Sequence, residues 1–199
     1  MLFQTLIIFS YGEKREPPFL TTQLFNLANI TGILCQILTS NVSGAGTDGN
    51  VYLGIGGREF RLDSSADDYE KNSFREYILG RAPLEPNLPA PQVRVNNKEN
   101  NDPRNGYQLD TSNLNKFPVY IRFEPVNSDD NWNLRFTAVL VYTGASQFNT
   151  AYTVSEEFEN LWLGKSFGKI VYLIELDTER GVGILEKGYE MANHISRKV

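Results

Sequence analysis

Short runs in which apolar and polar residues alternate recur through the middle of this 199-residue chain. In the run 119–124, Val119, Ile121 and Phe123 would lie on one face of a strand, with polar neighbours on the other face. Such short runs, with turn residues between them, predict an all-β protein that folds as a two-layer antiparallel sandwich. Six more runs fit this pattern: 30–38, 51–55, 58–62, 74–79, 134–142 and 169–176.

Two of these runs predict a tight hairpin. "VYLGI" (51–55) and "REFRL" (58–62) are separated only by Gly56-Gly57, the two-residue spacing of a hairpin turn. The run 134–142 begins with alternation and ends as a continuous apolar stretch, which is typical of a central strand.

Three segments depart from the strand pattern. Residues 82–117 contain several prolines and then an asparagine-rich run, which predicts a long surface insertion with one small hairpin around Asn105-Gly106. The segment 155–163 has Ser155 as a candidate N-cap and apolar residues at helical spacing, so it predicts a short helix. The tail 184–198 predicts a terminal helix that a glycine at 188 would interrupt.

Composition narrows the possible partners. Ten Tyr and twelve Phe favour β structure, because aromatic rings suit half-buried pleated surfaces. The net charge of −5 argues against nucleic acid as a partner and against unaided binding to an anionic membrane.

Neither the cysteine count nor the N-terminus indicates an oxidising compartment. Cys35 is the only cysteine, so no intrachain disulfide and no cysteine-based metal cage is possible. Residues 1–9 are apolar but follow no basic residue, so they predict a strand and not a signal peptide. No apolar run reaches the length of a transmembrane helix. We therefore expect an intracellular or peripheral-membrane location.

Three segments between predicted strands are rich in oxygen-bearing side chains. Each could form ordinary turns, which favour Asp, Asn, Ser and Gly. Because alternate loops of a sandwich gather at one end, the three segments could also hold Ca²⁺ together. They are "GAGTDGN" with Asp48, "SSADDYEKNS" with Asp67, Asp68 and Glu70, and "NSDDNW" with Asp129 and Asp130.

The order and wording of these blocks resemble PLAT (lipoxygenase-homology) domains. "GAGTDGNVYLGIGG" matches the Gly-Thr-Asp-x-Asn-Val-Tyr strand entry of that family, and "RLDSSADDYEKNS" and "YIRFEPVNSDDNW" follow at similar spacing. The resemblance covers about residues 31–176, including the atypical insertion at 82–117. It leaves residues 1–30 as an N-terminal extension with a strand and 177–199 as a tail with a possible helix.

The resemblance implies an eight-stranded sandwich that docks on membranes or partner proteins, in many members with Ca²⁺ at the loops of one end. This chain departs from the family in the third loop, where Asp129-Asp130-Asn131 stands before the tryptophan in place of Gly-Pro-Gly. Carried over by position, the implied Ca²⁺ ligands are the carbonyls of Gly46 and Thr47 and the carboxylates of Asp48, Asp67, Asp68 and Asp130.

Two aromatic residues near these loops are candidates for lipid contact. Trp132 could insert at the headgroup level of a membrane, although the family pattern places this tryptophan at a strand start facing the core. Tyr69 would contact lipid only if its ring pointed outward. Trp162 is expected in the core.

Three functions remain open from the sequence. No Ser-His-Asp or Cys-His arrangement can be assembled around His194 or Cys35, so we expect a stand-alone module and no enzyme. The leading hypothesis is a Ca²⁺-assisted binder of a lipid or membrane surface. The alternatives are a protein-interaction module with a structural or vestigial Ca²⁺ site, and a carbohydrate-binding sandwich that uses Tyr52, Tyr120 and Tyr142. The lipid or protein partner and the oligomeric state are not determined by the sequence.

Overall fold

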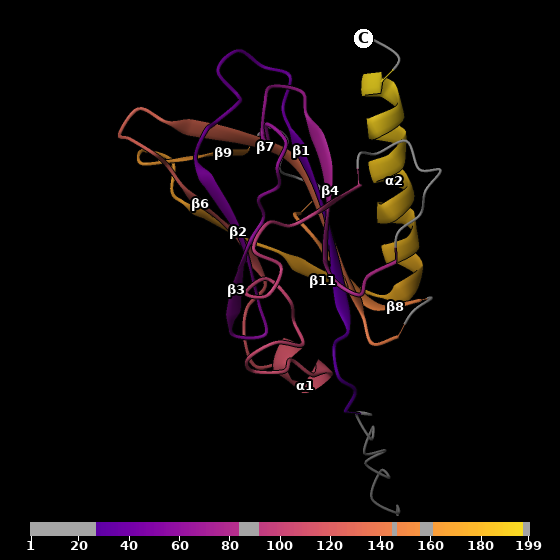
Figure 1. Cartoon of the computed structure of the whole chain (residues 1–199). Helices are drawn as coiled ribbons and strands as arrows, with labels where there is room; N and C mark the ends of the chain where they lie inside the picture. The colour runs from indigo at the N-terminus through magenta and orange to yellow at the C-terminus, as the bar shows by residue number, and fades with distance from the viewer. Residues whose placement is uncertain (1–26, 84–91, 145–146, 156–160, 197–199) are drawn as a thin grey trace, which may run out of the picture.

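The computed structural model describes residues 27–83, 92–144, 147–155 and 161–196. Within these residues the chain forms two β-sheets packed face to face, with one long helix on the outside of the larger sheet (Figure 1). The two-layer sandwich and the C-terminal helix are confirmed. The described residues form eleven short strands, in place of the eight that the resemblance implied: β1 Gly32–Thr39, β2 Asn50–Ile55, β3 Arg58–Arg61, β4 Phe74–Gly80, β5 Gln92–Arg94, β6 Tyr120–Glu124, β7 Asn131–Tyr142, β8 Phe148–Thr153, β9 Leu161–Gly164, β10 Ile170–Tyr172 and β11 Ile174–Leu176.

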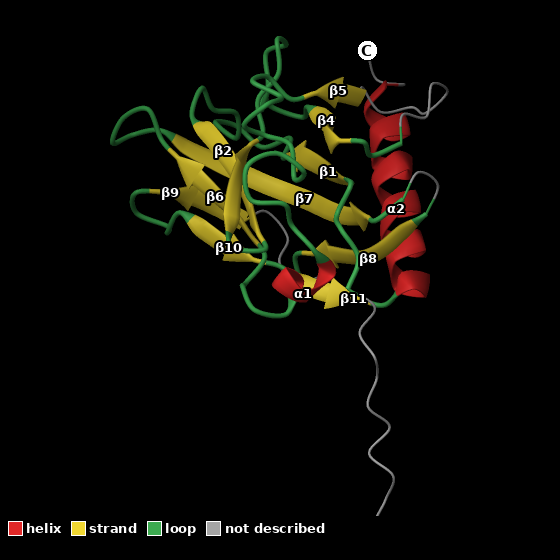
Figure 2. Cartoon of the chain, turned by 60° about the horizontal axis from the view of Figure 1, so that its bottom comes forward, coloured by secondary structure: helices red, strands yellow, loops and turns green. Residues whose placement is uncertain are grey.

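The larger sheet has the strand order β11-β8-β7-β1-β4-β5, and β9 pairs with the first part of β7. The smaller sheet has the order β10-β6-β2-β3. Of the strand pairs within the described residues, all are antiparallel except β4 with β5, which run parallel. Figure 2 shows the two layers and the helix α2 beside the larger sheet.

The core between the sheets follows the predicted alternation. Ile121 and Phe123 of β6 are fully buried, whereas Glu124 is exposed. The hairpin at Gly56-Gly57 is also confirmed, since Ile55 pairs with Arg58 across it. Both glycines have positive φ, 59° and 80°, which explains why this turn needs them.

The predicted strand at 169–176 is divided between the two sheets. β10 pairs with β6 in the smaller sheet, and β11 pairs with β8 in the larger one. Leu173 lies between them and is buried, so a single apolar run crosses from one layer to the other. Periodicity shows the apolar run but not the change of partner.

The helix predicted at 155–163 is not found where the structure can test it. Residues 161–164 form strand β9, and residues 156–160 lie outside the described residues. Pairing with the start of β7 decides the conformation, because tertiary contacts override a weak local helical pattern. Trp162, expected in the core, is only partly buried.

The described part of the insertion, residues 82–83 and 92–117, packs onto the sandwich and contributes to its core. Val95 and Leu109 are buried in the main core, and residues Thr111–Leu114 form the short helix α1. Arg58 fixes the segment by donating hydrogen bonds to several of its carbonyl oxygens, including those of Asn105 and Tyr107, both at 2.9 Å. No strand hairpin forms at 105–106. The sequence did not predict this packing, because Arg58 holds the segment through backbone carbonyl oxygens. Every residue has such an oxygen, so amino-acid composition gives no sign of these hydrogen bonds.

The helix α2 (Thr178–Ser196) covers the outer face of the larger sheet (Figures 1 and 2). Its residues Ile184 and Ala192 belong to a second apolar cluster with Leu34, Leu38 and Phe136 of the sheet. Strand β1 is consequently buried on both faces.

Gly188 does not interrupt α2. An added Cβ there would overlap the Gln36 side chain, so glycine allows the helix to approach the sheet closely.

Neither helix within the described ranges combines the length and the apolar character that crossing a bilayer demands. The strand predicted at residues 1–9 lies outside the described residues.

Candidate functional site

Three loops meet at one end of the sandwich, as the sequence predicts. Loop 1 (residues 40–49) leads into β2, loop 2 (62–73) joins β3 to β4, and loop 3 (125–130) joins β6 to β7. The Thr47 amide of loop 1 donates a hydrogen bond to the Tyr69 carbonyl of loop 2, at 3.3 Å. The Thr47 hydroxyl donates to Asp130 Oδ1 of loop 3, at 2.6 Å. Thr47 therefore joins all three loops.

Two glycines allow this close assembly. An added Cβ on Gly46 would lie 3.0 Å from the Lys71 amide nitrogen of loop 2. An added Cβ on Gly49 would overlap the Phe123 ring and lie 2.9 Å from Asp130 Oδ2. The Gly49 amide donates to the Thr47 hydroxyl at 2.8 Å, which orients that hydroxyl toward Asp130.

A cluster of three carboxylates lies between loops 1 and 2. Each of Asp48, Asp67 and Glu70 is exposed, and one carboxylate oxygen from each lies within 4.8 Å of the others. Asp48 borders two adjacent depressions, of ≈ 180 and ≈ 520 Å³. Gly46 and Thr47 line the larger one, so their backbone lies beside the cluster. Three hard oxygen donors at this spacing are the ligands that Ca²⁺ prefers.

Glu70 is the member of the cluster that the implied ligand set omitted. It is brought to Asp48 by the backbone at Tyr69, whose φ of 67° turns the chain sharply between Asp68 and Glu70. A tyrosine with positive φ is uncommon, and nothing in the local sequence indicates it. The only available signal was the acidic composition of the loop itself.

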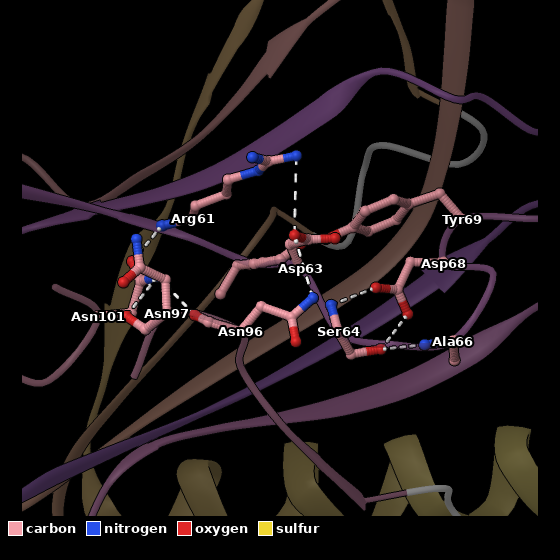
Figure 3. Close-up of polar contacts among 10 residues, drawn as sticks. Arg61, Asp63, Ser64, Ala66, Asp68, Tyr69, Asn96, Asn97 and Asn101 are labelled. Carbon is pink, nitrogen blue, oxygen red and sulfur yellow. Dashed lines mark hydrogen bonds and ion pairs between the residues drawn. The ribbon is translucent and has the colours of Figure 1, made fainter. Parts of the chain in front are cut away.

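Asp68 does not join the cluster, because its carboxylate accepts hydrogen bonds from another residue of loop 2 (Figure 3). It accepts hydrogen bonds from the Ser64 amide at 2.7 Å and the Ser64 hydroxyl at 2.9 Å, and it lies 3.5 Å from Arg75 Nε. Its side chain is 5% exposed. Asp68 therefore stabilises the loop that presents Asp67.

Asp130 is also used within the protein. One carboxylate oxygen accepts from Thr47, and the other accepts from the Val126 amide at 2.9 Å. Its two oxygens therefore hold loop 3 against loop 1, and the structure does not bring Asp130 into the three-carboxylate cluster.

The start of loop 2 is anchored to the insertion (Figure 3). Asn101 accepts a hydrogen bond from the Arg61 amide at 2.8 Å, and Asp63 lies 3.7 Å from the Arg61 guanidinium. Asn96 donates to Asp63 at 3.3 Å. The insertion thus supports one side of the loop that carries Asp67.

The two aromatic residues considered for lipid contact are both in the core. Trp132 is 0% exposed and Tyr69 is 4% exposed. Their rings pack edge to face at 5.4 Å, and the Trp132 indole donates to the Thr39 hydroxyl at 3.0 Å. The Tyr69 hydroxyl donates to the Leu62 carbonyl, and burial raises its pKa well above the ordinary value. Lipid could not reach either ring without opening the core, which corrects that expectation.

The three tyrosines considered for carbohydrate binding do not form one platform. Tyr142 lies in the larger sheet and is 6% exposed. The Tyr52 ring has the Arg122 guanidinium 4.0 Å from its centroid. Tyr52 and Tyr120 both lie on the outer face of the smaller sheet, where the Tyr120 ring lies over Gly54, so Tyr142 of the other sheet cannot join them.

The fold and these contacts define an antiparallel-type β-sandwich that presents three exposed carboxylates on the loops of one end. No protein-family model matches the sequence, and no curated protein matches it.

Solved structures show weak similarity over most of the chain. Alpha toxin from Clostridium absonum is 20% identical with a TM-score of 0.45, covering 74% of this chain and 32% of the toxin. Alpha toxin from an avian strain of Clostridium perfringens is 19% identical with a TM-score of 0.43, covering 73% and 31%. Coral 8R-lipoxygenase, described as activated by calcium via a C2-like domain, is 14% identical with a TM-score of 0.42, covering 72% and 17%.

This chain therefore spans about a third or less of each of these proteins. Membership of the PLAT family stays a prediction.

Proposed function

We propose that this protein is a non-catalytic module that binds a lipid or membrane surface with the help of Ca²⁺ held between loops 1 and 2. One observation carries the proposal, namely the convergence of the exposed carboxylates of Asp48, Asp67 and Glu70 within 4.8 Å. In the proposed site these carboxylates are the side-chain ligands, and the backbone carbonyls of Gly46 and Thr47 supply further oxygens.

Electrostatics supports a cation at this position. Three carboxylates this close repel one another, and a divalent ion converts that repulsion into attraction. Ca²⁺ takes about six to eight oxygen ligands, so three side chains and two carbonyls leave positions for water or for a phosphate oxygen of a lipid. The ion would thereby join an acidic protein end to an anionic headgroup.

The reactive side chains of the chain support binding and not catalysis. Cys35 is fully buried in β1, and burial raises the pKa of its thiol to about 12, so the thiol stays protonated and weakly nucleophilic. His194 lies in the last turn of α2 and lines a depression with Asn41 of loop 1 and Asn72 of loop 2, but it is not a member of the carboxylate cluster. The carboxylates of Asp68 and Asp130, both partly buried, are engaged in holding the loops.

Calorimetric Ca²⁺ titration tests the cation site directly. We expect wild-type protein to bind Ca²⁺, and Asp48→Asn, which keeps the side-chain size but removes the charge, to lose measurable binding. Asp177→Asn is a matched control, because Asp177 is exposed and lies at the start of α2, outside the loops. Equal heats in wild type and Asp48→Asn would contradict the proposed site.

A further inference from the structure

The turn between β9 and β10 exposes an aromatic ring between two lysines. Residues 165–170 are all exposed, and the Phe167 side chain is 60% exposed. The Phe167 ring stacks on the partly buried Trp162, with centroids 6.0 Å apart and planes at 30°. The stacking fixes Phe167 at the tip of the turn, while Lys165 and Lys169 flank it in the sequence.

This turn lies at the same end of the sandwich as the acidic loops. Gly164, which precedes the turn, pairs with Asn131, the first residue after loop 3. The Lys169 carbonyl, which follows the turn, accepts from the Phe123 amide at 2.8 Å, and Phe123 packs against loop 1 at Gly49. Figure 1 shows the turn after β9 beside the loop that joins β6 to β7.

The charge of the turn is opposite to that of the loops. Between residues 161 and 173 the sequence "LWLGKSFGKIVYL" contains two lysines and no acidic residue, although the whole chain carries a net charge of −5. The neighbouring edge strand β10 adds exposed Ile170 and Tyr172, at 43% and 62%. Val126 of loop 3, 59% exposed, adds a further apolar side chain at this end.

Single exposed apolar residues are common on protein surfaces and need no explanation. Here, however, the aromatic and the basic residues share one projecting turn, and this combination suits a bilayer. Aromatic rings favour the headgroup level, and lysines extend from an apolar surface to lipid phosphates. The ring also projects outward on its own turn, whereas hot spots of protein interfaces usually fill pockets.

We propose that the turn 165–169 is a second membrane contact, in which Phe167 inserts into the interface of an anionic phospholipid bilayer and Lys165 and Lys169 bind lipid phosphates. This proposal rests on the proposed membrane-binding function and names the lipid that it selects. The turn needs no cation for its own contact, whereas the acidic loops do. The two contacts together orient the end of the sandwich toward the membrane.

Vesicle co-sedimentation tests the turn. The vesicles are phosphatidylcholine alone or phosphatidylcholine mixed with phosphatidylserine, each with Ca²⁺ or with a chelator. We expect Phe167→Ala to weaken binding to the mixed vesicles about tenfold, in both Ca²⁺ and chelator, because an inserted ring loses its apolar burial. We expect the double substitution K165Q/K169Q to weaken binding about tenfold on mixed vesicles and to have little effect on phosphatidylcholine alone.

The chain offers a matched control at the opposite end of the sandwich. Phe117 is 46% exposed, follows Lys116, and packs near Gly57 at the far end of β2. The double substitution K116Q/F117A should leave vesicle binding unchanged. Calorimetric Ca²⁺ titration and thermal unfolding of Phe167→Ala should match wild type, which would show that the fold and the cation site are intact.

The possible outcomes separate this inference from the proposed function. If Phe167→Ala binds mixed vesicles as wild type does, the turn is not a membrane contact, while a Ca²⁺ dependence of wild-type binding would still support the acidic loops. If Phe167→Ala loses binding that never depended on Ca²⁺, the turn is supported and the Ca²⁺ role fails. If wild type binds no vesicle in any condition, neither the turn nor the acidic loops bind a phospholipid bilayer, and both proposals are overturned.

Discussion

Gly49 has no room for a side chain, because its Cα faces the Phe123 ring and the Asp130 carboxylate. The same is true, less severely, of Gly46 against loop 2. The glycines of "GAGTDGN" are thus needed for the close approach of three backbones. Thr47 then joins the three loops through its hydroxyl and its amide. Asp48 is the residue that this segment contributes to the carboxylate cluster.

We expect Gly49→Ala to lower the free energy of unfolding by about 2 kcal/mol, because the added methyl group overpacks the junction of loops 1 and 3. Urea denaturation measures this change. Gly144→Ala is the control, since an added Cβ there meets no atom within 4 Å, and it should change stability little. A Gly49→Ala protein as stable as wild type would show that the junction relaxes.

Glu59 makes the best-defined surface ion pair of the smaller sheet. Arg122 donates to it through Nε at 2.7 Å and Nη2 at 2.8 Å, and the Tyr120 hydroxyl donates at 3.0 Å. The hydrogen bond from Arg122 lowers the pKa of Glu59 below its ordinary value of 4.5.

A folded-state pKa below the unfolded-state pKa means that this carboxylate stabilises the protein above about pH 4.5, and that its contribution is lost as the pH falls through the folded-state pKa. We therefore expect Glu59→Gln to lose less stability than wild type on acidification below pH 4.5. Denaturation curves at a series of pH values measure this slope. Parallel pH dependence in the two proteins would contradict the assignment.

At the scale of elements, α2 explains why both faces of the larger sheet are apolar. The helix places small residues against the sheet at Gly181, Gly188 and Ala192, and Ile184 fills the space between them. Beneath the helix, the buried Glu76 carboxylate is paired, because it accepts hydrogen bonds from the side chains of Gln36 and Gln92. The close approach of α2 to the larger sheet requires glycine at 181 and 188, although glycine is a poor helix former.

Two glycines of the same helix should respond in opposite directions to alanine. Gly183 is exposed and an added Cβ meets nothing within 4 Å, so Gly183→Ala should stabilise the protein by about 0.5–1 kcal/mol through helix propensity. Gly188→Ala should destabilise it by about 1–3 kcal/mol, because its Cβ would overlap Gln36 and lie 3.1 Å from the Phe136 ring. Thermal and urea unfolding measure both. Equal effects would show that α2 does not pack closely on the sheet.

The elements that the sequence predicts well are those whose neighbours agree with their local pattern. The alternation in 119–124 and the Gly56-Gly57 hairpin are found as predicted, because period and turn chemistry alone determine them. The segment 169–176 was divided between sheets, and 161–164 became a strand, because the pairing partner decided the outcome in both cases. Partner choice depends on residues distant in the sequence, which periodicity does not contain.

The candidate site was predictable in its location but not in its membership. The sequence placed Asp48 and Asp67 on loops of one end, and the structure brings them together. It did not show that Ser64 and Arg75 hold Asp68, or that Thr47 holds Asp130. The sequence does not distinguish an aspartate that accepts hydrogen bonds from the loops from one whose carboxylate is free to bind a cation.

At the scale of the whole molecule, a bound cation should stabilise the fold, because the three carboxylates come together only in the folded state. At a Ca²⁺ concentration of about 100 times Kd, the free energy of unfolding should rise by about 2.7 kcal/mol in wild type. The Asp48→Asn protein should show no such rise. Chemical denaturation with Ca²⁺ and with a chelator measures the difference, and an equal rise in both proteins would place the ion elsewhere.

The most direct test of the central claim is calorimetric Ca²⁺ titration of wild type and of single substitutions within loops 1 and 2. The account predicts that Asp48→Asn, Asp67→Asn and Glu70→Gln each abolish measurable binding. It predicts that Asp63→Asn, whose carboxylate is held by Arg61 and Asn96, weakens binding only slightly through lost charge. Absence of binding in wild type, or binding that survives all three cluster substitutions, would contradict the account.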